Sequence, residues 1–191
     1  MKKLGLILIV GIIVVLAITA FFLSQNQPSS DLETPVNLAP TEILGQVQAP
    51  EGVDPTSLSV ISLAGSSDID SEGRFKAEIR QDGVSVLGAM PEGKEFGLVK
   101  VVVITNDTAE ESVVLDIQST AISAVFLTPY FMTNDPVLAQ KILAVIETDP
   151  KVAALTQVVE QVFNNSDPLS EPQYQQALAT AIQSVLVSLN Q

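Results

Sequence analysis

An uncharged apolar segment near the start of the chain, Leu4–Leu23, sets where all later residues are placed. Its 20 residues contain no charged side chain, and Lys2 and Lys3 precede it. A helix of this length is about 30 Å long, which matches the hydrocarbon thickness of a bilayer. The segment therefore predicts a single transmembrane helix that contacts the lipid bilayer. Residues 1–3 form its cytoplasmic tip by the positive-inside rule.

A cleaved secretory signal is the alternative interpretation of this segment. Such signals usually have an apolar core of about 7–15 residues followed by a small-x-small cleavage site. The core here is longer, and a cut after Ala20 would place Ile18 at the −3 position. An uncleaved anchor is therefore favoured over a secreted product. No later apolar run approaches this length, so we expect an extracytoplasmic head at the cell membrane.

The chain after Leu23 is strongly acidic. All 22 acidic residues and seven of the nine basic residues lie there, which gives this part a net charge of −15. Such a charge disfavours nucleic acid and anionic membrane surfaces as partners. The absence of histidine and cysteine excludes Ser-His-Asp and Cys-His catalysis, histidine zinc sites and disulfides. A non-catalytic protein is therefore expected, and a carboxylate-dependent hydrolase is the enzymatic alternative.

A flexible linker and a β-rich domain are expected next. Residues 24–41 contain three prolines and show no apolar periodicity, which is typical of a linker. Residues 42–118 contain short apolar runs separated by turn residues, which predicts an antiparallel β-sandwich. The expected strands cover residues 43–47, 58–63, 74–80, 84–90, 97–104 and 112–117.

Several short motifs between residues 43 and 104 follow one another in a familiar order. They are Gly45-x-Val47, the aliphatic run Leu58–Leu63, the hairpin Asp70-Ser71-Glu72-Gly73-Arg74-Phe75 and Val86-Leu87-x-Ala89. This order resembles the carboxypeptidase regulatory-like domain, a transthyretin-like β-sandwich. The resemblance implies an accessory, non-catalytic module of exported proteins. The chain departs from the family pattern at Asp54-Pro55-Thr56, where a proline and glycine run is usual.

The apolar period becomes helical from Ser119. Residues 119–191 predict a small bundle of four helices, two of which open with Asp135-Pro136 and Asp149-Pro150. The first helical stretch, Ala121–Phe131, is apolar nearly all round. That pattern is typical either of a core helix or of a partner-binding surface. The predicted fold is α+β: a transmembrane helix, a β-sandwich and a C-terminal α-helical bundle.

The turn that contains Asp68, Asp70 and Glu72 is a candidate calcium loop. Its spacing begins like a calcium-binding loop, but Ile79 stands where the bidentate glutamate is expected. A hairpin turn in which Gly73 adopts positive φ is the alternative. A Ser-Lys dyad would need Lys141 or Lys151 to be buried, and both fall at helix positions expected to be exposed. No catalytic residue and no other cofactor is therefore expected.

Together these patterns predict a membrane-anchored binding or scaffolding protein of the bacterial cell envelope that catalyses no reaction. Its head would bind a protein or a glycan. An envelope-assembly subunit tethered by the anchor is the alternative function, with the carboxylate-dependent hydrolase behind it.

Overall fold

The computed structural model describes residues 41–62, 65–79, 83–92, 96–104, 112–165 and 167–190. The predicted anchor Leu4–Leu23 and residues 24–40 of the predicted linker lie outside these ranges. None of the described helices has the length and apolar character needed to cross a bilayer. The described part is α+β, with two mostly antiparallel sheets and four α-helices, which confirms the predicted class.

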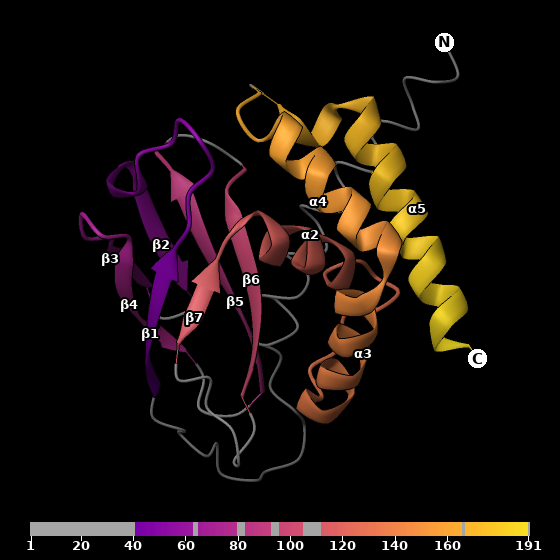
Figure 1. Ribbon diagram of the computed structural model, residues 1–191. Coiled ribbons are helices and arrows are strands. Elements are labelled where there is room, and N and C mark those ends of the chain that lie inside the picture. Colours follow the sequence, from indigo (N-terminus) through magenta and orange to yellow (C-terminus); the bar gives the residue numbers. More distant parts are fainter. Residues whose placement is uncertain are drawn as a thin grey trace, which may run out of the picture.

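Seven strands form two sheets that pack face to face (Figure 1). The three-stranded sheet has the order β4 (Arg74–Ile79), β1 (Thr41–Val47), β7 (Val113–Leu115). The four-stranded sheet has the order β3 (Gly65–Asp68), β2 (Leu58–Ser62), β5 (Gly83–Pro91), β6 (Leu98–Ile104). Apolar side chains from both sheets, such as Phe75 and Leu87, fill the space between them.

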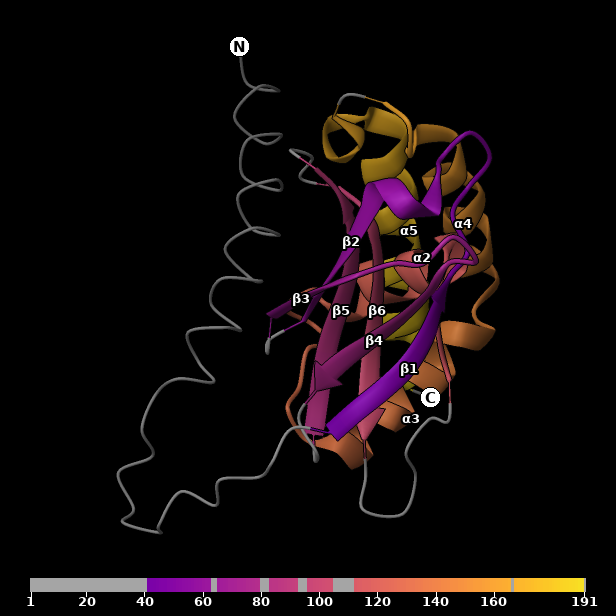
Figure 2. The same ribbon diagram turned by 90° about the vertical axis from the view of Figure 1, so that its left-hand side faces the viewer.

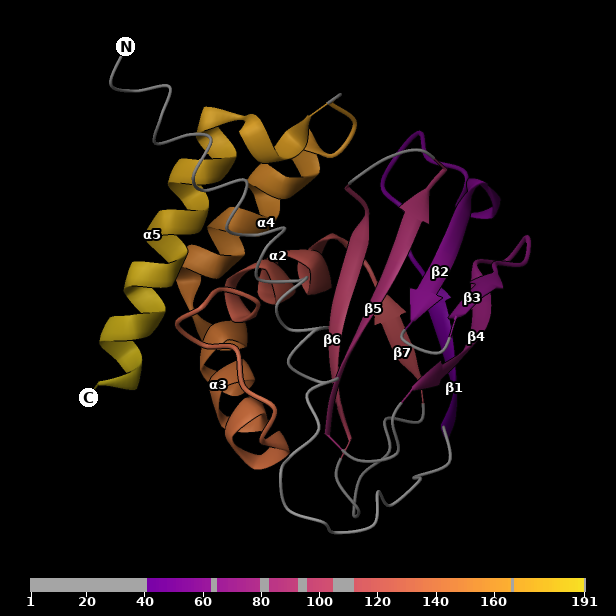
Figure 3. The same ribbon diagram turned by 180° about the vertical axis from the view of Figure 1, so that it is seen from behind.

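The four described helices are α2 (Ile117–Phe126), α3 (Pro136–Thr148), α4 (Pro150–Val162) and α5 (Pro172–Leu189). Of these, α2 and α3 pack against the four-stranded sheet at β5 and β6, and the other two pack on α2 and α3 (Figure 3). A second apolar core lies between the helices and the sheet, and it includes Val84, Val101, Phe126 and Leu155. Strands β5 and β6 are therefore covered on both faces. Double coverage explains why their sequences are almost continuously apolar rather than alternating.

The Asp-Pro pairs start helices as predicted. The Asp135 carboxylate accepts hydrogen bonds from the backbone N–H groups of Val137 (2.9 Å) and Leu138 (3.1 Å). Asp149 accepts one from the N–H of Lys151 at 2.7 Å. Each bond satisfies a donor that the helix itself cannot pair, and the following proline loses no bond at this position.

The apolar spacing of the sequence predicts one face on α4, with Val152, Leu155, Val159, Val162 and Phe163, and one on α3, with Leu138, Ile142, Val145 and Ile146. The structure confirms the face of α4 and only part of that of α3. Val152, Leu155 and Val159 are buried on α4, in agreement with the apolar stripe. Leu138, expected inward on α3, is instead 47% exposed, and Ala139 is buried in its place. The buried stripe of α3 therefore follows Ala139, Ile142 and Ile146, and it differs from the predicted stripe mainly in the first turn of the helix.

The strand predictions differ from the structure in two ways. Gly65–Asp68 forms β3, an additional strand whose Gly-Ser-Ser-Asp sequence has no apolar alternation to reveal it. Strand β7 pairs parallel to β1, so the three-stranded sheet is not wholly antiparallel. The predicted junction at residues 118 and 119 lies inside α2, which begins at Ile117.

Candidate binding groove at the open side of the sandwich

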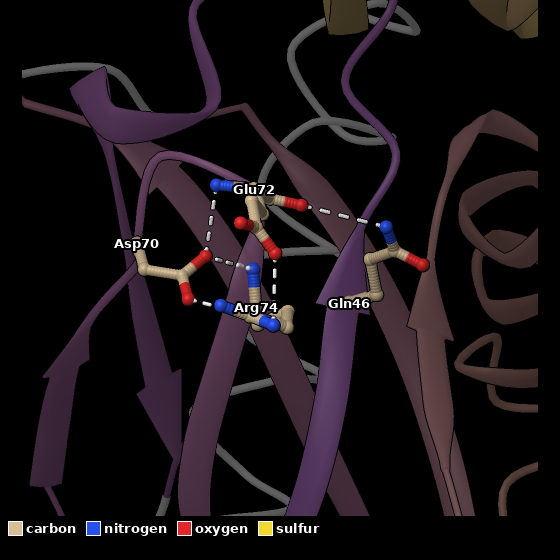
Figure 4. Close-up of polar contacts among 4 residues, drawn as sticks. All are labelled: Gln46, Asp70, Glu72 and Arg74. Carbon is tan, nitrogen blue, oxygen red and sulfur yellow. Dashed lines mark hydrogen bonds and ion pairs between the residues drawn. The ribbon is translucent and has the colours of Figure 1, made fainter.

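A compact turn carries the chain from β3 in one sheet to β4 in the other (Figure 4). One oxygen of the Asp70 carboxylate accepts hydrogen bonds from the backbone N–H groups of Glu72 (2.9 Å) and Arg74 (2.8 Å). Its other oxygen accepts one from Nε of Arg74 at 2.9 Å. The Arg74 guanidinium also pairs with the Glu72 carboxylate at 2.8 Å. The turn is therefore closed by its own side chains.

The same bonds favour the ionised form of Asp70. Hydrogen bonds from the backbone N–H and the side chain of Arg74 hold the pKa of this carboxyl below its ordinary value. Gly73 adopts φ +80°, and its carbonyl oxygen accepts from the N–H of Val47 on β1 at 2.7 Å. A Cβ at residue 73 would lie 2.6 Å from the Val47 carbonyl oxygen. Glycine is thus required where the turn meets the other sheet.

The three residues of the candidate calcium loop have different surroundings. Asp70 and Glu72 come together around Arg74, whereas Asp68 lies at the end of β3, opposite Ser59 of β2. The described residues contain no group of three or more acidic side chains arranged to hold a metal ion. Gly73 has the positive φ of the alternative interpretation, a hairpin turn. Calcium binding stays a hypothesis, which calcium titration of the full-length protein would test.

Figure 2 shows β3 and β4 at the edges of the two sheets, beside this turn. A groove lies there, lined by residues of both strands. It consists of two hollows of about 350 and 670 Å³ that share Ser67 and Lys76. The smaller hollow lies at the end away from the turn, between Ser66 of β3 and Glu78 of β4. The larger follows β1 and the turn, and Leu44 is among its lining residues. We call the two hollows together the edge groove.

Acidic side chains oppose each other at the smaller hollow. Glu42 of β1 and Glu78 of β4 are directly paired in the antiparallel register. Like charges in this arrangement destabilise a sheet. The Nζ of Lys76 lies 3.0 Å from a carboxylate oxygen of Glu42, and both side chains are more than half exposed. Lys76 offsets one of the two negative charges, so this end of the groove keeps an excess of negative charge.

One hydroxyl group at the groove has no partner. The Oγ atom of Ser67 is shielded from solvent and makes no hydrogen bond to any of the described residues. Ser67 belongs to both hollows and points to the same side of its sheet as the buried Val60, its partner on β2. A buried hydroxyl without a partner costs free energy, and a bound polar group could supply the missing bond.

Most of the described carboxylates, including the opposed Glu42 and Glu78, are exposed. Among the described carboxylates only Asp149 is buried, and it caps α4. Lys141 and Lys151 are exposed, as expected. The apolar stretch Ala121–Phe131 belongs largely to the core, since Val125 and Phe126 are fully buried within it. This agrees with the core-helix interpretation.

Sequence reasoning missed a row of hydroxyl groups on α2. The backbone N–H groups of Val99 and Val101 on β6 donate to Thr120 Oγ1 and Ser123 Oγ, each at 2.9 Å. Ser119 Oγ donates back to the Val99 carbonyl oxygen at 3.1 Å. This hydroxyl ladder, formed by residues 119, 120 and 123, satisfies the outer edge of β6. The available signal was three hydroxyls at positions i, i+1 and i+4 of an otherwise apolar helix.

Comparisons with protein-family models, with curated proteins and with solved structures give no match to this chain. The proposed function therefore depends on the sequence and on the geometry and chemistry of the described residues.

Proposed function

We propose that this chain is a membrane-anchored binding or scaffolding protein of the bacterial cell envelope that catalyses no reaction. Leu4–Leu23 would hold it in the bilayer, and the polar residues after it would act as a flexible tether. A coil of this length spans on the order of 23 Å. The described residues would form the extracytoplasmic head that binds a partner.

The edge groove is the observation that carries this proposal. Its two hollows have volumes of about 350 and 670 Å³, each within the range of about 300–1,000 Å³ that is usual for ligand sites. Its charged side chains, such as Glu42 and Lys76, are exposed rather than enclosed. Exposed charges and small hydroxyl side chains suit reversible recognition, whereas acid–base catalysis usually needs groups whose pKa is tuned by burial.

The surroundings of the carboxylates also support binding over hydrolysis. A glycosidase-type mechanism needs two carboxyl groups about 5–10 Å apart in a cleft, with one kept protonated by its surroundings. Asp70 has the opposite tendency, since its hydrogen bonds lower its pKa. The one buried carboxylate of the described residues, Asp149, is engaged as a helix cap.

The β-sandwich would serve as an accessory module of the carboxypeptidase regulatory-like type. The Asp70–Phe75 motif, on which the resemblance depends most, forms the corner between the two sheets. Gly45 and Phe75 of the same motif series pair across β1 and β4. These placements support a structural role for Gly45 and for the Asp70–Phe75 motif.

Cell fractionation and site-specific crosslinking test the proposal. We expect the full-length chain in the membrane fraction, and we expect protease added from outside to remove the head. A photoreactive residue at Glu78 should yield crosslinks in cells, whereas the same residue at the exposed Glu147 of α3 serves as the control. Recovery of the untrimmed chain in the aqueous fraction would refute the anchor. Equal crosslinking at both positions would refute binding at the groove.

A further inference from the structure

The sheets protect two of their edges from pairing with other chains. Exposed strand edges attract foreign strands, and proteins usually cover or shorten them. The hydroxyl ladder of α2 covers β6, because Thr120 and Ser123 accept from its outer N–H groups. Strand β7 has only three residues and also contacts α2. The side of the sandwich formed by β6 and β7 is therefore closed.

On the opposite side, formed by β3 and β4, no helix of the described residues packs against the strands (Figure 2). Strand β4 carries Arg74, Lys76 and Glu78 at its exposed positions, and such charges discourage strand addition. Strand β3 is Gly-Ser-Ser-Asp, with neither lysine nor proline. No backbone hydrogen bond joins β3 to β4 among the described residues, although the turn connects them. The outer edge of β3 is therefore the least protected edge of the described sheets.

The edge groove lies along this unprotected strand. Gly65, Ser66 and Ser67 of β3 line the smaller hollow, with Glu42 and Glu78 on the other wall. A peptide added to a free edge gains main-chain hydrogen bonds, and its alternate side chains reach opposite faces of the sheet. A basic side chain on one of these faces would lie near the two opposed carboxylates and offset their repulsion.

We infer that the edge groove binds an extended peptide with basic side chains, which pairs with β3 as an added strand. The free edge of β3 supplies the affinity, and the Glu42–Glu78 pair supplies the preference for positive charge. This inference rests on the proposed binding function and names the class of its partner.

Hydrogen exchange with a defined peptide tests the inference. The full-length protein in detergent micelles is mixed with an acetylated seven-residue peptide in which valine alternates with lysine. At ten times the dissociation constant, exchange of the amides of residues 65–68 should slow by about tenfold. The same peptide with glutamate in place of lysine should protect them much less. No protection by the lysine peptide, or equal protection by both peptides, overturns the inference.

Charge-removing variants give the matched control. The double variant Glu42→Gln, Glu78→Gln removes two exposed charges and should lower the affinity for the lysine peptide about two- to fivefold. The double variant Glu147→Gln, Glu160→Gln removes two exposed charges from α3 and α4 and should leave its binding unchanged. Equal weakening in both double variants would indicate general electrostatic attraction and overturn the assigned site.

Two further outcomes separate this inference from its alternatives. Concentration-dependent dimers with β3 protected in the absence of peptide would identify a second copy of the chain as the occupant, and would overturn the inference. Crosslinks at Glu78 in cells, without protection of β3 by the lysine peptide, would also overturn it. The latter result would leave the proposed binding function standing with another class of partner.

Discussion

Replacement of Ser123 by alanine should destabilise the protein more than an ordinary serine substitution on a helix surface. Ser123 is 1% exposed, and its Oγ accepts a hydrogen bond from the N–H of Val101 at 2.9 Å. The same hydroxyl donates to the Val99 carbonyl oxygen at 3.3 Å. Alanine keeps the helix and removes both bonds. The N–H of the buried Val101 then loses its acceptor.

The magnitude follows from the group that is left without a partner. A buried donor without an acceptor costs about 1–3 kcal/mol. Alanine is the better helix former and returns about 0.5 kcal/mol. The free energy of unfolding should therefore fall by about 1–2 kcal/mol in Ser123→Ala. Ser188→Ala is the matched control, because Ser188 is exposed and its hydroxyl bonds only to Ser184 of its own helix. It should change stability by about 0.5 kcal/mol at most.

Two measurements on the solubilised full-length protein check this prediction. Urea unfolding followed by circular dichroism gives the difference in unfolding free energy, provided that the slope with denaturant is unchanged. Hydrogen exchange reports the amide of Val101 directly, and its exchange should accelerate in Ser123→Ala alone. If the two serine variants lose equal stability, or if the Val101 amide exchanges at its original rate, the hydroxyl ladder does not hold the edge of β6.

Three other predictions concern packing, an unpaired hydroxyl and pH. In Gly45→Ala the new Cβ would lie 2.1 Å from the Phe75 ring, so urea unfolding should show a loss of about 1–3 kcal/mol. Adding Phe75→Leu should recover part of that loss, and strictly additive effects would contradict the clash. The Ser85 hydroxyl is buried and has no hydrogen-bond partner among those of residues 41–190 that the structure describes, so Ser85→Ala should raise the unfolding free energy by about 1 kcal/mol. A decrease would mean that Ser85 has a partner. Burial raises the pKa of Tyr174 from 10.0 to about 12. The protonated tyrosine therefore contributes fully to the free energy of unfolding below pH 10, and this contribution is lost as pH rises through 12. This loss, about 3 kcal/mol, should be absent from Tyr174→Phe in melting curves recorded across that range, and equal losses in both proteins would contradict it.

The helix starts could be predicted because their signals act within one turn. Asp135 and Asp149 each cap a helix whose first residue is proline, and no distant contact is needed for either effect. The stripe on α4 was predictable for a related reason, since one helix face is buried along its whole length. The error at Leu138 arose at the first turn of α3, where Ala139 also fits an apolar spacing.

The open side of the sandwich could not be predicted because it depends on distant partners. Gly65–Asp68 becomes a strand through pairing with β2, and its own side chains carry no β-signal. The parallel pairing of β7 with β1 joins segments that are more than 60 residues apart. The sequence predicts Ser119 and Thr120 as caps of the first helix. This prediction is right in part, because Ser119 completes a capping box with Asp116, while the contact of α2 with β6 is tertiary.

The two sides of the sandwich differ because the helices cover only one of them. Helix α2 follows β7 after a single residue, and it lies along β6, so the β6–β7 side closes as the chain leaves the sandwich. On the other side, Glu42 at the start of β1 lines the edge groove one residue after the predicted tether ends. A partner in the groove would thus lie beside the point where the proposed tether meets the head. Its distance from the bilayer would be set by the tether, on the order of 23 Å. Shortening the tether should therefore reduce crosslinking at Glu78 in cells, while peptide protection of β3 in detergent micelles stays the same. If both decline together, the tether contributes to the groove itself rather than to its position.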